Sequence, residues 1–319
     1  MTGDSYMGVK VVVDRVSHLK AQPETRRESL SSYAESQELG RGQQTLHEAV
    51  NSHRIYEPIR GVHPRIELPD EEFEKWLDGN QEIEYVVINF SDTEEVIERD
   101  GDLSQVLEPW HIPVILGTEC DEAVNARTLQ DVLDVLAIAQ PAIYVPDVVY
   151  SYNWMEDEIQ ENALEAYTGH VRTLQELVIE ENFDVRLIPT NKGWKYEHFL
   201  EYRELFEEFD YEELAFYAVQ YTGGDAGNAI NVLRSHVRNS IAAIDMEDVF
   251  LIGRLAEDDL LDFAPRVRGA TGLRQWTDEC STERRLSQRL WPAFREGREA
   301  KLSVNDGLEQ RPVNEFGGT

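Results

Sequence analysis

Residues 214–244 read LAFYAVQYTGGDAGNAINVLRSHVRNSIAAI, and this stretch has the form of a strand, a turn and a helix. The run at 214–221 is apolar and rich in aromatic side chains, as buried strands are. After Ala229 the apolar residues recur at spacings of three and four, which predicts an amphipathic helix. Gly223, Gly224 and Asp225 lie between the two patterns, where glycine permits a tight turn. The stretch therefore predicts one βα unit.

The same pattern recurs along the chain, with helix-like segments between most of the apolar runs. Continuous hydrophobicity within a run predicts a strand buried on both faces, as in a parallel sheet covered by helices. Eight such strands predict an α/β fold of the (β/α)8 TIM-barrel type. A doubly wound open sheet is the alternative, and the absence of G-x-G-x-x-G or a Walker lysine disfavours its nucleotide-binding form. The other runs are at 9–16, 85–90, 112–119, 142–150, 184–191, 248–255 and 267–273.

Domain organisation follows from the segments that break this rhythm. Residues 1–299 are predicted to form a single barrel domain with a long insertion after the first strand. The span 17–84 is too long for a simple connection, so we expect an excursion over one mouth of the barrel. The last residues, 300–319, read as a loose tail.

The charge of the chain limits its partners. Asp and Glu number 62 against 30 Lys and Arg, giving a formal charge of −32. Such a surface repels itself in dilute buffer and is screened in concentrated salt, which predicts a halophilic, cytoplasmic protein. It disfavours a broad nucleic-acid surface, which needs clustered cations. Arginines are enriched only at 266–298, where they either contact tRNA or DNA locally or pair with surface carboxylates.

The few cysteines, the scattered histidines and the lack of long apolar segments disfavour disulfide-rich, metal-binding and membrane proteins. Cys120 and Cys280 are the only cysteines, so one disulfide is conceivable and a disulfide framework is not. The eight histidines are scattered without a ligand motif, so we expect no metal and no cofactor. No run is long enough to cross a bilayer and no signal peptide is evident, so we expect no membrane contact.

Polar residues follow the predicted strands, and in a barrel these ends meet at one face and form the active site. A planar heterocycle needs carboxylate, amide and backbone partners with an aromatic wall. Asp147, Gln220, Tyr150 and Trp194 supply them, although each of these is also an ordinary turn or cap residue. The strand-end set is Asn89, Ser91, Asp92, Thr118, Glu119, Cys120, Asp147, Tyr150, Asn191, Lys192, Trp194, Gln220, Gly223, Gly224, Arg254, Arg274, Gln275 and Trp276.

Two glycine-bearing motifs carry a family resemblance. The segment VQYTGG (219–224) is followed one helix later by LIGRLA (251–256), and AIYVPDVVYSYN (142–153) precedes both. This order resembles the tRNA-guanine transglycosylase-like superfamily, including relatives that act on DNA. These are barrels that exchange guanine for a 7-deazaguanine base such as queuine.

The resemblance implies a base pocket and a mechanism. Asp147, Gln220, Gly223, Gly224 and Gly253 would hold the base, with Arg254 beside them. Paired carboxylates serve as nucleophile and proton carrier in glycosyl chemistry, and Asp278 and Glu119 are the candidates for these roles.

Other functions stay open on the sequence alone. The family's D-S-G-G motif and its C-x-C-x-x-C zinc site are absent. This absence favours the alternative of a barrel without catalysis that binds nucleic acid or protein. A third alternative is a metabolic lyase or isomerase that uses Lys192 as an imine-forming amine or a base.

Overall fold

The structure is a computed structural model that describes residues 57–221, 229–261, 263, 265–283 and 285–303. Its centre is one curled, parallel sheet of eight strands in the order β5-β4-β3-β2-β1-β8-β7-β6. The strands are β1 (Gly61–Ile66), β2 (Tyr85–Asn89), β3 (Ile112–Leu116), β4 (Ile143–Val145), β5 (Arg186–Leu187), β6 (Glu213–Tyr217), β7 (Asp248–Ile252) and β8 (Val267–Gly272).

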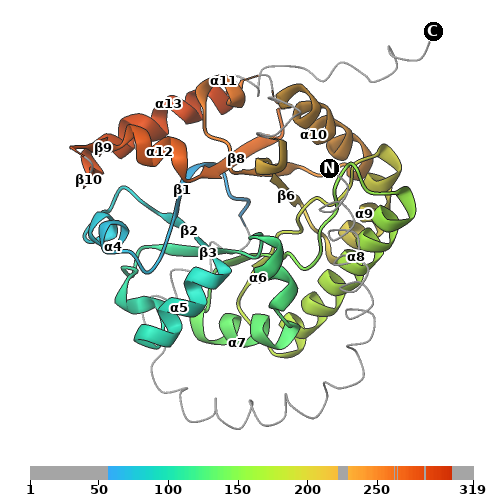
Figure 1. Ribbon diagram of the computed structural model, residues 1–319, viewed down its shortest axis with the longest axis horizontal. Helices are drawn as coiled ribbons and strands as arrows, with labels where there is room; N and C mark the ends of the chain where they lie inside the picture. The colour runs from blue at the N-terminus through green and yellow to red at the C-terminus, as the bar shows by residue number, and fades with distance from the viewer. Residues whose placement is uncertain (1–56, 222–228, 262, 264, 284, 304–319) are drawn as a thin grey trace.

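Helices follow the strands along the chain and surround the sheet, as Figure 1 shows. A short antiparallel hairpin, β9 (Ser281–Thr282) with β10 (Arg285–Leu286), lies near the end of the described chain. The helices are α4 (Glu71–Leu77), α5 (Phe90–Asp100), α6 (Asp121–Ala126), α7 (Leu129–Ala139), α8 (Asp157–Glu180), α9 (Tyr196–Phe209), α10 (Ile230–Ile244), α11 (Glu257–Leu260), α12 (Arg274–Glu279) and α13 (Trp291–Ser303).

Burial on both faces of the sheet explains the continuous apolar runs. Every residue of β3 and of β7 is buried. One set of side chains packs inside the curl of the sheet, including Val87, Val114 and Val145. The residues between them pack outward against the helices, as Val86, Ile88 and Ile115 do. Both faces are covered, so alternation of polar and apolar residues is lost in these strands.

The segment after β5, at one end of the curled sheet, contacts β6 at the other end. Thr190 forms a parallel bridge with Ala215, just beyond the end of β5. The backbone N–H of Ala215 donates to the Pro189 carbonyl, and that of Asn191 donates to the Ala215 carbonyl, both at 2.8 Å. Hydrogen bonds therefore join the segment that follows β5 to β6.

The first strand differs from the sequence prediction. The run at 9–16 lies outside the described residues, and β1 falls within 17–84, where no strand was predicted. Residues 61–66 therefore belong to the sheet, and the prediction was wrong for this segment. The segment GVHPRI was missed because its buried positions, Val62, Pro64 and Ile66, alternate with polar ones. The predicted tail begins inside α13, which continues to Ser303.

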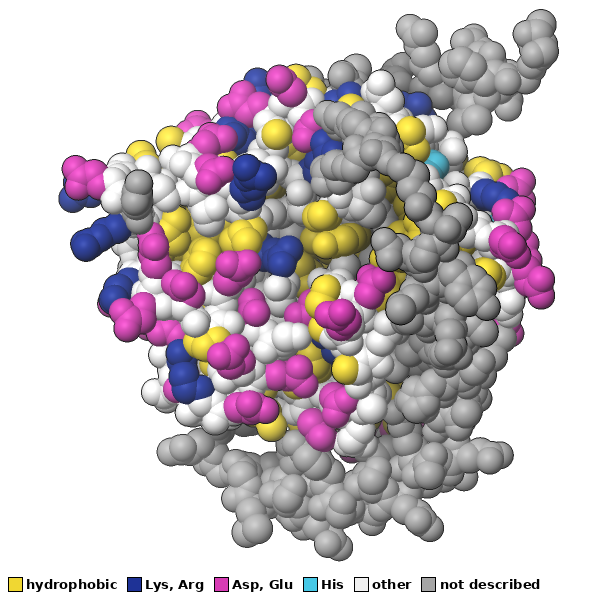
Figure 2. All heavy atoms as spheres, in the orientation of Figure 1, with side chains coloured by type: hydrophobic (Ala, Val, Ile, Leu, Met, Phe, Trp, Pro, Cys, Tyr) yellow, Lys and Arg dark blue, Asp and Glu magenta, His cyan; other side chains and the backbone are white. Residues whose placement is uncertain are grey.

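The surface is as acidic as the composition implies, with Asp and Glu side chains spread over the face in Figure 2. Cys120 and Cys280 are both free thiols, so the one conceivable disulfide is not formed. Among the helices of the described residues, none has the length and apolar character needed to span a membrane.

Candidate functional site

Three polar side chains follow the inward-facing residues of β2, β3 and β4. Val87, Leu116 and Val145 pack inside the curl of the sheet. Two residues beyond each of them come Asn89, Thr118 and Asp147. Side chains two apart along extended chain share a face. These three polar groups therefore cap the inner apolar cluster at the carboxyl ends of the strands, a place we call the mouth.

Asp147 and Lys192 form a buried ion pair at the mouth. The Nζ of Lys192 lies 2.6 Å from Oδ1 of Asp147, and their side chains are 9% and 1% exposed. The backbone N–H of Lys192 donates to the Tyr202 hydroxyl at 2.7 Å, which fixes the loop after β5. The two charges come from the loops after β4 and β5, and the pairing of these neighbouring strands brings the loops together.

Gly117 allows the loops after β3 and β4 to come this close. A Cβ at position 117 would lie 2.7 Å from the backbone nitrogen of Asp147 and 2.9 Å from the Tyr144 hydroxyl. Any larger residue would push the two loops apart. Glycine at this position thus sets the place of Asp147.

Several buried polar atoms at the mouth have no hydrogen-bond partner among the described residues. Folded proteins pair nearly all such atoms, so each exception requires an explanation. Within the described part of the chain, the unpartnered atoms include Oδ1 of Asn89, Oγ1 of Thr118, Oδ2 of Asp147 and the hydroxyl of Tyr150. All four belong to strand ends or to the loops that follow them. The mouth therefore offers acceptors and donors to a ligand.

Tyrosines surround the Asp147 carboxylate. Burial raises the pKa of Tyr150 and of Tyr217, and the negative charge of Asp147 raises both further. Both phenols consequently stay protonated and can donate hydrogen bonds. The ring of Tyr150 stacks on Tyr152 with centroids 6.0 Å apart, and Tyr152 stacks on Trp154 at 5.4 Å. These three rings extend from the mouth to the surface, where Trp154 is 51% exposed.

Glu119, the expected proton carrier, is fully engaged by its neighbours. Ser91 donates its backbone N–H to Oε1 and its hydroxyl to Oε2, each at 3.0 Å. The guanidinium of Arg127 pairs with Oε2 and also donates to the Gly117 carbonyl at 2.8 Å. Glu119 therefore ties the loop after β3 to the first turn of α5.

Asp278, the expected nucleophile, does not lie with the buried groups. It is on α12, its side chain is 71% exposed, and its nearest cation is Arg274 at 3.7 Å. A solvated carboxylate on a helix surface is poorly placed to attack a bound sugar. The structure does not bring Asp278 together with Asp147, which disfavours the role that the sequence suggested.

Three of the expected binding residues, Gln220, Gly253 and Arg254, lie in or against the turn after β6. Gln220 is exposed in a short 3-10 turn, η3 (Val219–Tyr221). Gly253 has φ +94°, and a Cβ there would lie 2.2 Å from Cγ2 of Val219. Arg254 is buried and donates to Asp259 at 2.6 Å and to the Tyr221 carbonyl at 3.1 Å. Gly253 and Arg254 thus hold this turn in place, while Gly223 and Gly224 lie outside the described residues.

Trp194 packs beside the mouth. Its indole N–H donates to the Ser151 hydroxyl at 3.0 Å, and its ring contacts Tyr221 with centroids 5.6 Å apart. It fixes the loop after β4 to the loop after β5. Trp194 therefore supports the position of Asp147 and Lys192 through the loops that carry them.

Arginines of the segment 266–298 mostly pair with acids. Such pairing was the alternative to a nucleic-acid surface, and the exposed pairs among them contribute little to stability. The pairs are Arg266–Asp245, Arg268–Asp248, Arg274–Asp278, Arg295–Glu82 and Arg298 with Glu257 and Glu279.

Two residues of the mouth were missed on the sequence, Arg65 of β1 and Tyr217 of β6. The charge of Arg65 lowers the pKa of Tyr217, against the larger effect of burial and the effect of Asp147. Alternation of polar and apolar residues in GVHPRI was the signal that could have placed Arg65 on the inner face. Tyr217 was hidden within an apolar run.

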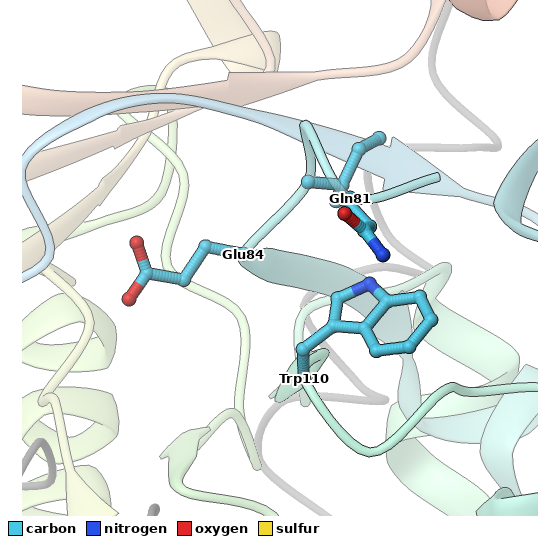
Figure 3. A pocket seen from close by; sticks show the side chains of 4 residues that line it. Gln81, Glu84 and Trp110 are labelled. Carbon is cyan, nitrogen blue, oxygen red and sulfur yellow. The ribbon is translucent and has the colours of Figure 1, made fainter. Parts of the chain in front are cut away.

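A surface hollow lies elsewhere on the molecule, lined by Gln81, Ile83, Glu84 and Trp110. Figure 3 shows the labelled side chains around it. Glu84 directly precedes β2, so this hollow is at the amino end of the strands, away from Asp147. Active sites of parallel barrels form at the other end.

Metal ligands are not grouped anywhere in the described ranges, where no cluster of three His, Cys, Asp or Glu side chains could hold an ion. No protein-family model and no curated protein matches this chain.

Proposed function

We propose that the chain is a closed (β/α)8 barrel whose mouth binds a guanine or 7-deazaguanine base. Closure is supported by the hydrogen bonds between the ends of the sheet at Ala215. The polar groups without partners lie at the carboxyl ends of the strands, which is where such barrels bind ligands.

The observation that carries the proposal is the buried pair of Lys192 and Asp147. Oδ2 of Asp147 accepts no hydrogen bond within the described residues, and Oδ1 faces the ammonium of Lys192. Guanine presents an acceptor, O6, next to two donors, N1–H and the N2 amino group. An ammonium beside a carboxylate is complementary to this acceptor–donor–donor edge. Adenine presents the opposite order and would meet mismatched groups.

Aromatic and polar neighbours complete the site. Tyr150 offers a ring that already stacks on Tyr152, and a flat base adds naturally to such a stack. The side-chain amide oxygen Oδ1 of Asn89 and the hydroxyl of Thr118 are further partners for the ligand's polar edge. The site therefore combines a flat wall with fixed polar groups, as small-molecule sites do.

We propose binding of the base and not its exchange, because the expected nucleophile and proton carrier do not lie together at the mouth. Base exchange needs a carboxylate free to attack the sugar. Asp278 is exposed on α12, and Glu119 is held by Ser91 and Arg127. If Asp278 is nevertheless the nucleophile, Asp278→Asn abolishes a covalent complex with guanine-containing nucleic acid. Exchange that persists in this variant removes Asp278 from that role.

Calorimetric titration with guanine, 7-deazaguanine and adenine in concentrated KCl tests the proposal. We expect guanine and 7-deazaguanine to bind and adenine to bind at least about tenfold more weakly. Asp147→Asn should lower the affinity for guanine by about tenfold or more, because an amide replaces one acceptor with a donor. Asp157→Asn is the matched control, since Asp157 also pairs with a lysine but is 68% exposed. Equal affinity for guanine in wild type and Asp147→Asn would refute the proposal.

Imine chemistry at Lys192 is a second candidate, favoured by the burial of its amine beside a carboxylate. Asp147 at 2.6 Å is placed to take the proton from the amine and return it to a departing hydroxyl. Borohydride reduction in the presence of a small aldehyde or ketone would then attach the substrate to Lys192. Peptide mapping without label at Lys192 would exclude this candidate.

A further inference from the structure

Among the described residues of this acidic protein, Arg65 has no side-chain partner. Its guanidinium forms no hydrogen bond or ion pair within the described residues, and its Nε is buried. The chain has 62 acidic residues against 30 basic ones, so carboxylate partners are abundant. Other arginines form ion pairs with such carboxylates, as Arg127 does with Glu119 and Arg186 does with Glu213. The unpaired state of Arg65 therefore needs a reason.

The position of Arg65 is inside the mouth. Val62 and Ile66 of β1 pack outward in the core under the helices. The intervening residue His63 faces inward, where its ring meets Tyr85 of the inner cluster at 4.9 Å. Arg65 is two residues further along the same face, toward the carboxyl end of β1.

Tyr217 links Arg65 to the proposed base site. The pKa of Tyr217 is raised mainly by burial, then lowered by Arg65 and raised by Asp147. Arg65 of β1 and Asp147 of the loop after β4 thus both act on the same phenol. Asp92 is an acid on which the charge of Arg65 acts: burial raises the pKa of Asp92 to about 6, and Arg65 opposes that rise. Its carboxylate instead accepts the backbone N–H of Leu68 at 3.3 Å and forms no ion pair with Arg65.

We propose that Arg65 anchors an oxyanion subsite in the mouth, so that the ligand carries a phosphate or carboxylate group as well as its base. Guanidinium is a planar fork that binds either oxyanion through two parallel hydrogen bonds. The hydroxyl of Tyr217, which stays protonated, adds a third donor. This inference rests on the proposed function, because it takes the mouth to be the ligand site.

Comparison of guanosine with guanosine 5′-monophosphate tests the subsite by calorimetry. Wild type should bind the monophosphate about tenfold more tightly than guanosine, which is the scale of one charge-assisted contact. Arg65→Gln should lose this preference and keep its affinity for guanosine. Arg65→Lys, which keeps the charge and loses the fork, should retain part of it. The control is Arg274→Gln, since Arg274 is 88% exposed on α12 and its loss makes the same charge change.

Failure of the subsite and failure of base binding give different results. Equal affinities of wild type for guanosine and its monophosphate overturn the subsite and leave base binding intact. So does a preference that survives in Arg65→Gln. If neither guanosine nor its monophosphate binds, base binding fails. Binding of inorganic phosphate, followed by ³¹P NMR, then tests the subsite alone. Phosphate bound by wild type and not by Arg65→Gln supports it, and phosphate bound by neither overturns it. Acetate added as a competitor in the same titration shows by displacement of phosphate whether the site also binds a carboxylate.

Discussion

Replacement of Lys192 by Met should destabilise the fold far more than the loss of an ordinary lysine. Lys192 and Asp147 are 9% and 1% exposed and their charged atoms are 2.6 Å apart. Removal of the lysine leaves a carboxylate buried without its counter-charge. Breaking a buried pair in this way costs about 3–5 kcal/mol. The methionine chain preserves most of the apolar contact, so the loss reports the charge.

A second lysine offers the matched control. Lys195, three residues after Lys192, pairs with Asp157, but the side chains of Lys195 and Asp157 are 43% and 68% exposed. An exposed pair is worth about 0–1 kcal/mol. Lys195→Met makes the same change of charge and of side chain in the same loop. The difference between the two variants therefore isolates the effect of burial.

Urea unfolding in concentrated KCl, followed by circular dichroism, measures both free energies. The double variant Lys192→Met with Asp147→Asn should recover part of the loss, because no charge is then left unpaired. If Lys192→Met costs no more than Lys195→Met, the carboxylate of Asp147 is hydrated. The reasoning that places a desolvated recognition group at the mouth would then be refuted.

Further predictions concern the turn at Gly253, the pH dependence and the thiols. Gly253→Ala should lower the free energy of unfolding more than Gly101→Ala. Both glycines have φ near +93°, but only at Gly253 would a Cβ clash with a neighbour. Urea unfolding should show an extra loss of about 1–3 kcal/mol from this overpacking. Burial raises the pKa of Glu213 to about 7, so the folded chain holds this proton more tightly than the unfolded chain. The free energy of unfolding should therefore fall as pH rises from 4.5 to about 7, by at most about 3 kcal/mol, and Glu213→Gln should flatten that slope. A thiol reagent should modify exposed Cys120 in the native protein and buried Cys280 only in urea, and rapid native labelling of both would contradict the fold.

The parallel sheet was largely predictable because its strands are covered on both faces. Long apolar runs predicted β2 to β8, and even the polar run at 267–273 forms β8. β1 was missed because its polar residues face the inside of the curled sheet and alternate with the apolar ones. His63 and Arg65 face inward there, and no run of apolar residues marks the strand.

The site was predictable only in part, for a related reason. Position at a strand end identified Asp147 and Lys192 separately, but their contact depends on how the loops after β4 and β5 meet. The same rule selected Glu119 and could not tell that Arg127 and Ser91 occupy it. Asp278 was selected by distance along the chain from β8, and the α12 helix turns it to solvent.

A crystal structure of the protein grown with guanine tests the central claim most directly. The account predicts guanine in the mouth, with N1–H and the N2 amino group about 3 Å from the Asp147 carboxylate and O6 facing Lys192. Tyr150 should lie against the plane of the base. An empty mouth at saturating guanine, with Asp147 and Lys192 paired as they are now, would contradict the account.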